Sequence, residues 1–293
     1  MSAVTSRTRA VIAMLAAVAL FSLMDAGLKV LSAHYPAFQV AALRGAASLP
    51  FVLAWATATT GLKPLLRVRW SLHLLRGVLG VAMMFGFVYA LRTLPLSTAY
   101  SIFFVAPLLI TVLSVPFLGE YVGPRRWIAI AIGLIGVLVV LRPTGDGVLT
   151  LAGLAVLLAA LGYAASAITV RVLARTDSTQ AMVVWLMTMM ALGAGALAWP
   201  DWVPLRGEHA WLIAGLGLAG ALGQYAITEA FRLGQASMLA PLEYTALLWG
   251  VLLDLTIWGV LPDTITWIGA AIIVASGLYL LRRERVHAEA ERP

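Results

Sequence analysis

The residues most able to do chemistry in this chain are acidic and basic side chains inside long apolar runs. Asp25 and Lys29 lie four residues apart in one run, Arg44 lies in the next, and Glu243 lies much further along. An ionisable group near the centre of a membrane costs about 2.5–3.5 kcal/mol on insertion scales, so it needs a partner or a polar cavity. Groups of this kind predict ion pairs, proton transfer or the binding of a charged solute.

Two interpretations stay open for these charges. The i,i+4 spacing of Asp25 and Lys29, with the acid first, favours an ion pair within one helix, and a role in binding is the other interpretation. Arg44 and Glu243 each lie about 12 Å from one end of their run, and so about 6 Å apart in depth in a hydrocarbon core of about 30 Å. We interpret Arg44 as a site for a carboxylate and Glu243 as a site for an amine or a coupling proton, with structural ion pairing as the alternative.

Polar aromatic side chains and one amide form a second set of candidate binding groups. A buried tyrosine hydroxyl needs a hydrogen-bond partner, and an amide in an apolar run is able to bond a solute. The candidates are Tyr100, Tyr163, Trp185, Gln224 and Tyr244. Packing between helices is the alternative for each. Glu120 and Glu229 have arginines close by in the sequence, so we expect them to form local ion pairs.

The elements that carry these residues are apolar stretches of about 20 residues, the length of a membrane-spanning helix. Hydrophobic residues make up 62% of the 293 residues and charged residues 11%, against about a quarter charged in soluble domains. The runs are too long and too little alternating for barrel strands. We therefore expect an all-α integral membrane protein with ten transmembrane helices over residues 10–32, 37–59, 70–91, 95–118, 124–141, 148–172, 179–199, 209–232, 235–260 and 263–282.

The basic residues between these runs are unevenly distributed. With the N-terminus in the cytoplasm, the cytoplasmic ends hold Arg7, Arg9, Lys63, Arg67, Arg69, Arg125, Arg126, Arg171, Arg175, Arg232, Arg282, Arg283, Arg285 and Arg292. The opposite side then holds Lys29, Arg92, Arg142 and Arg206. This bias predicts a multi-pass inner (plasma) membrane protein with both termini in the cytoplasm and anionic lipids at that face. The net charge of +7 is explained in this way without nucleic acid as a partner.

A repeat runs through the chain at an offset of 140 residues. Residues 77–142 align with 217–282, with matches that include Gly77 with Gly217, Gly80 with Gly220, Trp127 with Trp267 and Leu141 with Leu281. The unit contains five helices, and an odd number inverts the second copy in the membrane. Two inverted halves around a central site are typical of alternating-access carriers. The expected divisions are a cytoplasmic segment 1–9, a first repeat 10–142, a second repeat 148–282 and a cytoplasmic tail 283–293.

A series of short motifs also runs in order along nearly the whole chain. They are Phe21–Lys29, Ala42–Arg44, Pro95–Ala99, Ala106–Leu108, Gly119-Glu120, Trp127-Ile128, Pro241–Thr245 and Gly277–Arg282. In this series the chain resembles the EamA family of the drug/metabolite transporter superfamily. The resemblance implies two inverted five-helix repeats that move small metabolites across the inner membrane. Gly119-Glu120 becomes Gly259-Val260 in the second half, so that half does without the glutamate.

The same resemblance leaves the substrate open. Members of the family include exporters of amino acids and metallophores and importers of riboflavin or S-adenosylmethionine. The prediction is a secondary active transporter for a small polar or zwitterionic, amino-acid-like metabolite, working by alternating access as an exporter driven by a proton gradient or by exchange. The alternative is a membrane-embedded enzyme or an accessory subunit without transport activity. Monomer and homodimer both stay open.

Missing residue types narrow the chemistry further. The chain contains no cysteine, and its histidines lie near helix ends or in the tail, at His34, His73, His209 and His287. This pattern does not fit a rhomboid-like protease. The sequence contains no Walker A motif and no cluster with metal-ligand spacing. We therefore expect no catalytic residue, no metal and no cofactor.

Overall fold

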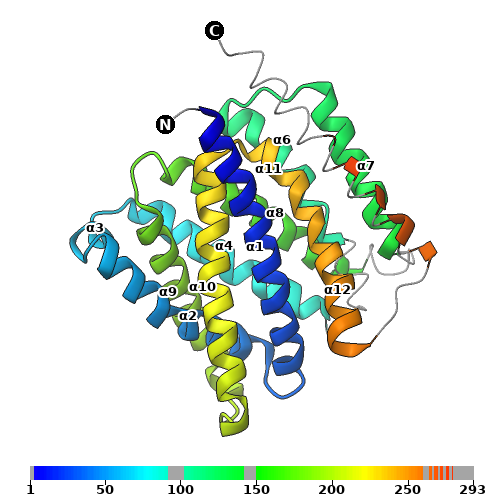
Figure 1. Ribbon diagram of the computed structural model, residues 1–293. Coiled ribbons are helices and arrows are strands. Elements are labelled where there is room, and N and C mark those ends of the chain that lie inside the picture. The colour runs from blue at the N-terminus through cyan, green and yellow to red at the C-terminus, as the bar shows by residue number, and fades with distance from the viewer. Residues whose placement is uncertain are drawn as a thin grey trace.

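The molecule, a computed structural model, is a bundle of helices. It describes residues 3–91, 102–141 and 150–259, together with residues 264–265, 267–269, 271–272, 275–276 and 279. Over these ranges the chain forms helices and turns and no strand. The long helices pack side by side and run through most of the height of the molecule (Figure 1). The prediction of an all-α fold is therefore confirmed.

The helix bounds follow the apolar runs closely. Before residue 142 the helices are α1 (Ala3–Ser32), α2 (Ala37–Thr59), α3 (Lys63–Leu66), α4 (Trp70–Leu91), α6 (Ala106–Leu118) and α7 (Pro124–Leu141). After residue 150 they are α8 (Leu151–Leu173), α9 (Thr179–Ala198), α10 (Ala210–Leu233), α11 (Ala236–Leu239) and α12 (Ala246–Trp258). Short 3-10 helices are η2 (Trp199–Asp201), η3 (Gly207–His209) and η4 (Ala240–Thr245). The bounds of α2, α4 and α7 are those predicted from the sequence.

Many of these helices are long and apolar enough to cross a membrane. Within the described residues, seven segments meet that criterion, and the apolar helices Ala106–Leu118 and Trp127–Gly136 are shorter. The predicted spans 95–118 and 263–282 lie partly outside the described residues. The helices therefore support a polytopic membrane protein, while the count of ten stays a prediction.

One predicted helix is interrupted. The run 235–260 was expected to form a single helix, but it forms α11, the 3-10 helix η4 and then α12. Pro241 lies at the start of η4, where it has no N–H to donate and its ring crowds the carbonyl one turn earlier. The tighter 3-10 geometry accommodates the proline. The backbone that carries Glu243 is therefore a break between two α-helical pieces.

The two halves of the chain place their helices at matching positions. α4 and α10 begin at Trp70 and Ala210, and α6 and α12 begin at Ala106 and Ala246, each pair 140 residues apart. α6 and α12 both have 13 residues. Each is followed by a glycine with a positive φ, 67° at Gly119 and 65° at Gly259, a conformation that favours glycine at a helix C-terminus. The spacing of the sequence repeat is thus also a spacing of structural elements.

The packing of the helices repeats when the halves are exchanged. α1 packs against α10, and its counterpart α8 packs against α4. Likewise α2 contacts α10 while α9 contacts α4, and α6 contacts α8 while α12 contacts α1. α2 and α9, which are counterparts of each other, pack together. Figure 1 shows α1 and α10 side by side although most of the chain separates them. The halves are therefore interleaved.

α1 and α10 run in opposite directions, which defines two ends of the bundle. Gly234 lies against Ala10, and Leu212 and Leu216 lie near Gly27. We call the end at which α1 begins and α10 ends the near end, and the opposite one the far end. The largest group of buried apolar residues lies toward the near end, between α1, α8, α10 and α11. Apolar side chains there offer no hydrogen bonds, so polar side chains buried at the near end need partners from neighbouring helices.

Close helix contacts depend on glycines at helix crossings. A Cβ at Gly45 of α2 would lie 2.6 Å from the backbone nitrogen of Ala191 on α9. A Cβ at Gly217 of α10 would lie 2.6 Å from the carbonyl carbon of Ala47 on α2. Backbone atoms cannot move aside without shifting a whole helix. Small residues at such crossings are typical of membrane helix packing.

The Gly217 contact gives a prediction with an internal control. Gly217→Ala is expected to lower the stability of the protein by about 1–3 kcal/mol, because the added methyl group forces α10 away from α2. Gly215→Ala, on the same helix, meets nothing within 4 Å and is expected to be neutral or slightly stabilising. Thermal unfolding of the two variants in detergent measures the difference. Equal midpoints for both variants would show that the crossing is not tight.

Candidate substrate-binding site

Glu243 and Tyr163, both predicted from the sequence, meet in the interior of the bundle. Glu243 lies in η4 after Pro241 and is 9% exposed. The hydroxyl of Tyr163, on α8, donates a hydrogen bond to Glu243 Oε1 at 3.2 Å. The break in the helix supplies the carboxylate and the straight helix α8 supplies the phenol. A buried carboxyl group with a hydrogen-bonding neighbour is suited to bind a cationic or hydrogen-donating solute and to exchange a proton.

Aromatic rings surround this pair. The ring centroid of Phe103 lies 5.8 Å from that of Tyr163 and 5.5 Å from that of Phe87. The ring centroid of Phe104 lies 6.1 Å from that of Tyr244. These rings come from α4, α8, η4 and the turn before α6. Flat apolar faces next to a carboxyl group favour a planar solute with polar edges.

Tyr244, the neighbour of Glu243, is also buried. It is 1% exposed, and its ring lies so close to α7 that a Cβ at Gly133 would be 2.6 Å from a ring carbon. Its hydroxyl has no hydrogen-bond partner among the described residues. A buried polar atom is usually paired, and one that is not requires an explanation. A buried hydroxyl without a partner among the described residues is a candidate for contact with a bound solute.

Arg44 lies in a second polar position, between α1, α2 and α10. It is buried, with its guanidinium carbon 5.5 Å from the ring centroid of Phe21. Asp25 of α1 interacts with it electrostatically. The guanidinium Nε has no partner among the described residues. Asp25 is therefore the acidic group whose charge acts on Arg44.

Gly220 of α10 faces this position and makes room for it. A Cβ at Gly220 would lie 3.9 Å from Arg44 Cγ and 3.0 Å from Ser48 Oγ. Ser48 in turn donates to the carbonyl of Gly217 at 2.9 Å. Lys29 lies at the exposed far end of α1, and its pairing with Asp25 stays a prediction. Tyr100 falls outside the described residues.

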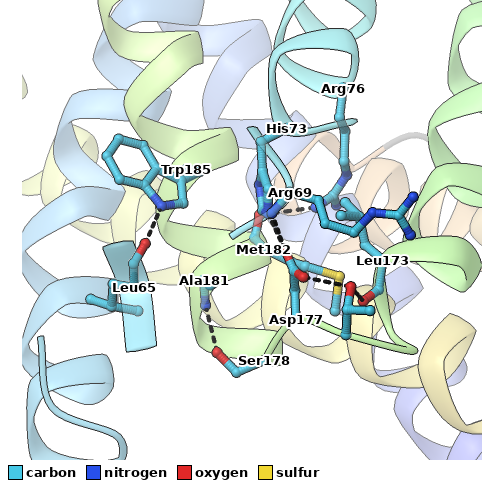
Figure 2. A network of polar contacts seen from close by, with 11 residues as sticks. Leu65, Arg69, His73, Arg76, Leu173, Asp177, Ser178, Ala181, Met182 and Trp185 are labelled. Atoms are coloured by element: carbon cyan, nitrogen blue, oxygen red, sulfur yellow. Dashed lines mark hydrogen bonds and ion pairs between the residues drawn. The ribbon is translucent and has the colours of Figure 1, made fainter. Parts of the chain in front are cut away.

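The remaining two sequence candidates take part in contacts between helices. Trp185 donates its indole N–H to the carbonyl of Leu65 at 2.7 Å, and its ring centroid lies 4.5 Å from that of Trp70; Figure 2 includes the Trp185–Leu65 bond. Gln224 donates to Thr228 at 3.3 Å within α10. These contacts give Trp185 and Gln224 structural roles, and any contact with substrate stays a prediction.

Arg76 is a buried cation that the sequence analysis did not select. It is 2% exposed on α4. Its Nη1 donates to the carbonyl of Met182 on α9 at 2.9 Å and its Nη2 donates to Thr228 on α10 at 3.5 Å. The available signal was an arginine inside an apolar run. It lies near the start of that run, and the fold places it among α4, α9 and α10.

A polar cluster close to Arg76 connects the start of α4 with the loop after α8 at the near end of the bundle. Asp177 accepts hydrogen bonds from Thr176 Oγ1 at 2.6 Å, the backbone N–H of Arg69 at 3.1 Å and His73 Nε2 at 2.8 Å (Figure 2). Burial alone would raise the pKa of Asp177. The three hydrogen bonds and the charge of His73 outweigh burial, so the pKa of this carboxyl lies below its ordinary value of 3.8.

The lowered pKa of Asp177 sets the sign of a pH effect. A carboxyl whose pKa is lower in the folded state stabilises that state above about pH 4, and the contribution is lost as the pH falls through the folded-state pKa. His73 faces the carboxylate, and its protonation strengthens the pair until Asp177 itself takes up a proton. We expect Asp177→Asn to lower the unfolding midpoint at neutral pH, with the difference from the parent protein shrinking below about pH 4.

Thermal unfolding in detergent over a pH series measures this difference. Asp201→Asn is the control, since Asp201 is exposed in η2 and is expected to leave the midpoint unchanged. A difference between Asp177→Asn and the parent that persists undiminished in strong acid would contradict a role for the carboxylate charge.

Acidic residues at the near end connect separate helices. Glu229 and Arg232 form the expected local ion pair at 3.4 Å, and Glu229 also accepts a bond from Thr179 at 2.6 Å. The local pairing expected of Glu120 involves Arg125 and Arg126, whose side chains lie outside the described part of the structure, so that pairing stays a prediction. The described partners of Glu120 lie in the second half of the chain, on the N-terminal turn of α11 and on α8 at Arg171.

The two apolar grooves on the surface lie apart from these residues. One, of about 540 Å³, runs between α4 and α9 along Gly77, Val81, Phe85 and Gly193. The other lies on the far part of α9 beside Trp199 and Trp202. None of the predicted binding residues lines either groove. Apolar walls of this kind are suited to lipid chains.

Apolar helices around a buried set of polar and aromatic groups are typical of membrane proteins that handle small solutes. A sequence model of the EamA-like transporter family matches residues 8–142 and again residues 150–282. The chain is therefore a multi-pass membrane transporter. It belongs to the EamA-like transporter family, as its motifs predicted, and this membership favours transport over the enzyme alternative.

Individual relatives agree with this assignment. The chain is 32% identical over 260 residues to a riboflavin transporter of Vibrio cholerae, covering 88% of this chain and 87% of that one. It is 27% identical to the pseudopaline exporter CntI of Pseudomonas aeruginosa, over 90% and 93% of the two chains. A crystal structure of another protein matches with a TM-score of 0.82 at 22% identity, over 92% of this chain and 96% of that chain. This last match supports the fold alone.

Proposed function

We propose that the protein is a secondary carrier that moves a small polar metabolite across the inner membrane by alternating access. The repeated helix positions and the exchange-symmetric packing support two five-helix halves of opposite orientation. In carriers of this kind, exchanging the conformations of the halves converts one open state into the other. Energy comes from a proton gradient or from exchange.

The near end of the bundle faces the cytoplasm in this proposal. α1 begins there, as does α11, and α10 ends there (Figure 1). Arg171, Arg175 and Arg232 lie toward this end of α8 and α10. Cytoplasmic ends of membrane helices carry excess arginine and lysine. Anionic lipids on that face are their natural partners, and both termini are cytoplasmic.

A planar heteroaromatic metabolite such as riboflavin is the first candidate substrate. The observation that carries it is the buried Glu243–Tyr163 hydrogen bond, with the ring of Phe103 near that of Tyr163. The adjacent Tyr244 has its ring near Phe104 and a hydroxyl with no partner among the described residues. Rings contribute stacking surfaces, and the carboxyl and hydroxyl groups pair with polar edges. The V. cholerae relative, which carries riboflavin by name, supports this substrate class.

A zwitterionic, amino-acid-like metabolite is the second candidate, moved outward. The buried Arg44, whose Nε has no hydrogen-bond partner in the described part of the chain, favours this substrate. Arg44 would hold the carboxylate, exchanging part of its interaction with Asp25, and Glu243 would take the amine or a coupling proton. The P. aeruginosa relative, an exporter by name, supports the outward direction.

Uptake and efflux by proteoliposomes test the proposal. Purified protein is reconstituted and offered riboflavin, a set of amino acids and S-adenosylmethionine, with and without a pH gradient. Saturable riboflavin movement supports the first candidate, and amino-acid efflux supports the second. Liposomes without protein are the control for leakage. No protein-dependent flux of any of these solutes in either direction would count against both candidates.

A further inference from the structure

Glu120 makes the densest set of carboxylate contacts between the two halves in the described part of the chain. It follows Gly119, whose positive φ turns the backbone sharply at the end of α6, and it is 8% exposed. Its Oε1 accepts the N–H of Ala236 at 2.9 Å. Its Oε2 accepts the N–H of Ser237 at 3.0 Å and the hydroxyl of Ser237 at 2.7 Å. A residue of the first half thus fastens a turn of the second.

The first turn of α11, which Glu120 bonds, is not stabilised by a continuous helix before it. The backbone is extended at Gly234, so α10 does not continue into α11. The first N–H groups of a helix have no partner within that helix, and those of Ala236 and Ser237 are buried. Four residues later the 3-10 helix η4 begins, which leads through Pro241 to Glu243. The start of this broken segment is therefore positioned by Glu120.

The repeat does not provide the same device twice. The sequence places Val260 where the first half has Glu120, so a carboxylate of this kind belongs to one half. Only the second-half segment carries an acidic side chain in its break, because Glu243 corresponds to Phe103 at the offset of 140. The anchoring carboxylate, Glu120, thus bonds the same segment of the second half that carries Glu243.

We propose that Glu120 is a positioning residue for transport: by bonding the first turn of α11 it holds the segment 236–245 so that Glu243 meets Tyr163. This inference rests on the proposed function of Glu243. Arg171 of α8 lies 3.7 Å from Glu120 and also donates to the carbonyls of Phe231 and Arg232. The positioning works through the three bonds to Ala236 and Ser237, and Arg171 adds charge balance.

Hydrogen–deuterium exchange of the full-length protein in nanodiscs tests the positioning directly. In Glu120→Gln one carboxylate oxygen becomes an amide nitrogen, which cannot accept a bond from a facing N–H. We expect exchange over residues 236–245 to become at least about tenfold faster, with the other helices unchanged. Ser237→Ala removes only the hydroxyl bond and should give a smaller change in the same peptide.

Glu229→Gln is the matched control, because Glu229 is a carboxylate at the same end bonded to Thr179 and Arg232. It should leave residues 236–245 unchanged, and Arg171→Gln should change them much less than Glu120→Gln. Unchanged exchange in both Glu120→Gln and Ser237→Ala would overturn the proposal. An equal rise over all helices would also overturn it, since that result describes general loss of stability.

Transport measurements then separate this inference from the proposed function. If Glu120 positions Glu243, Glu120→Gln should shift the pH profile of transport as well as lower its rate. A lower rate with an unchanged pH profile in a variant of normal stability would count against positioning. If the local exchange rises as expected but the parent protein moves no solute, the proposed function fails while the anchoring role of Glu120 stands.

Discussion

Replacing Glu243 by glutamine is expected to reduce gradient-driven transport by at least about 30-fold. Truncating or neutralising one member of a buried, hydrogen-bonded charged contact costs about 2–5 kcal/mol, and about 2 kcal/mol corresponds to 30-fold. The amide oxygen is still able to accept the bond from Tyr163, but it neither carries a proton nor balances a cation. Initial rates in proteoliposomes with an imposed pH gradient measure the loss.

Tyr163→Phe separates the hydrogen bond from the charge. It removes only the hydroxyl group that bonds Glu243, and we expect a decrease of about 2- to 12-fold, the effect of one hydrogen bond. If Glu243→Gln loses gradient-driven transport but keeps substrate exchange, Glu243 carries the proton and not the substrate. A variant that inserts normally and transports at the full rate would remove Glu243 from the mechanism.

Replacing Arg44 by alanine is expected to destabilise the protein by about 3–5 kcal/mol. Arg44 is buried and the charge of Asp25 on α1 acts on it. Removing one of two interacting charges inside a membrane leaves the other without compensation. Loss of the guanidinium also removes its packing on Phe21. The unfolding midpoint in detergent measures the effect, and transport is expected to fall with it.

The partner of Asp25 decides how this result is interpreted. Asp25→Asn combined with Arg44→Gln removes both charges, so the double variant should be more stable than Arg44→Ala. Lys29→Gln tests the other partner proposed from the i,i+4 spacing. If Lys29→Gln destabilises the protein as strongly as Arg44→Ala, Asp25 depends on both cations. If Arg44→Ala leaves the midpoint unchanged, the buried pair contributes nothing to stability.

The parts of the fold that were predictable are those governed by local patterns. The apolar runs with prolines or glycines at their ends predicted the bounds of α2, α4 and α7, because a spanning helix has to match the thickness of a bilayer. At Pro241 the sequence predicts only that a carbonyl one turn earlier loses its helical hydrogen bond. Whether a proline kinks a helix or divides it depends on which neighbours hold the loose ends, and at this break one of them is Glu120, far away in the sequence.

The candidate site was predictable as a set of residue types and not as a set of pairs. Tyr163 and Glu243 were both selected because polar groups in apolar runs need partners, but nothing in their spacing indicated that they would meet. The charge of Asp25 acts on Arg44, which lies on the next helix, and the pairing with Lys29 that the spacing favours stays a prediction. Arg76 was not selected as a candidate, and Glu120 was expected to pair with arginines close by in the sequence. Contacts between helices depend on how the helices pack. The pattern of apolar and polar residues within one helix does not show which other helix lies against it.

The interleaved packing of the halves has a consequence for biosynthesis. α1 and α4 find their main neighbours in α10 and α8, which emerge from the ribosome after the whole first half has been made. The early helices must therefore wait in the bilayer beside lipid or a chaperone before their native partners arrive. A chain cut in the 142–150 connection should yield two fragments that accumulate only when synthesised together. The repeat that makes a two-state carrier thus also makes a protein whose assembly cannot finish until nearly its last helix is in place.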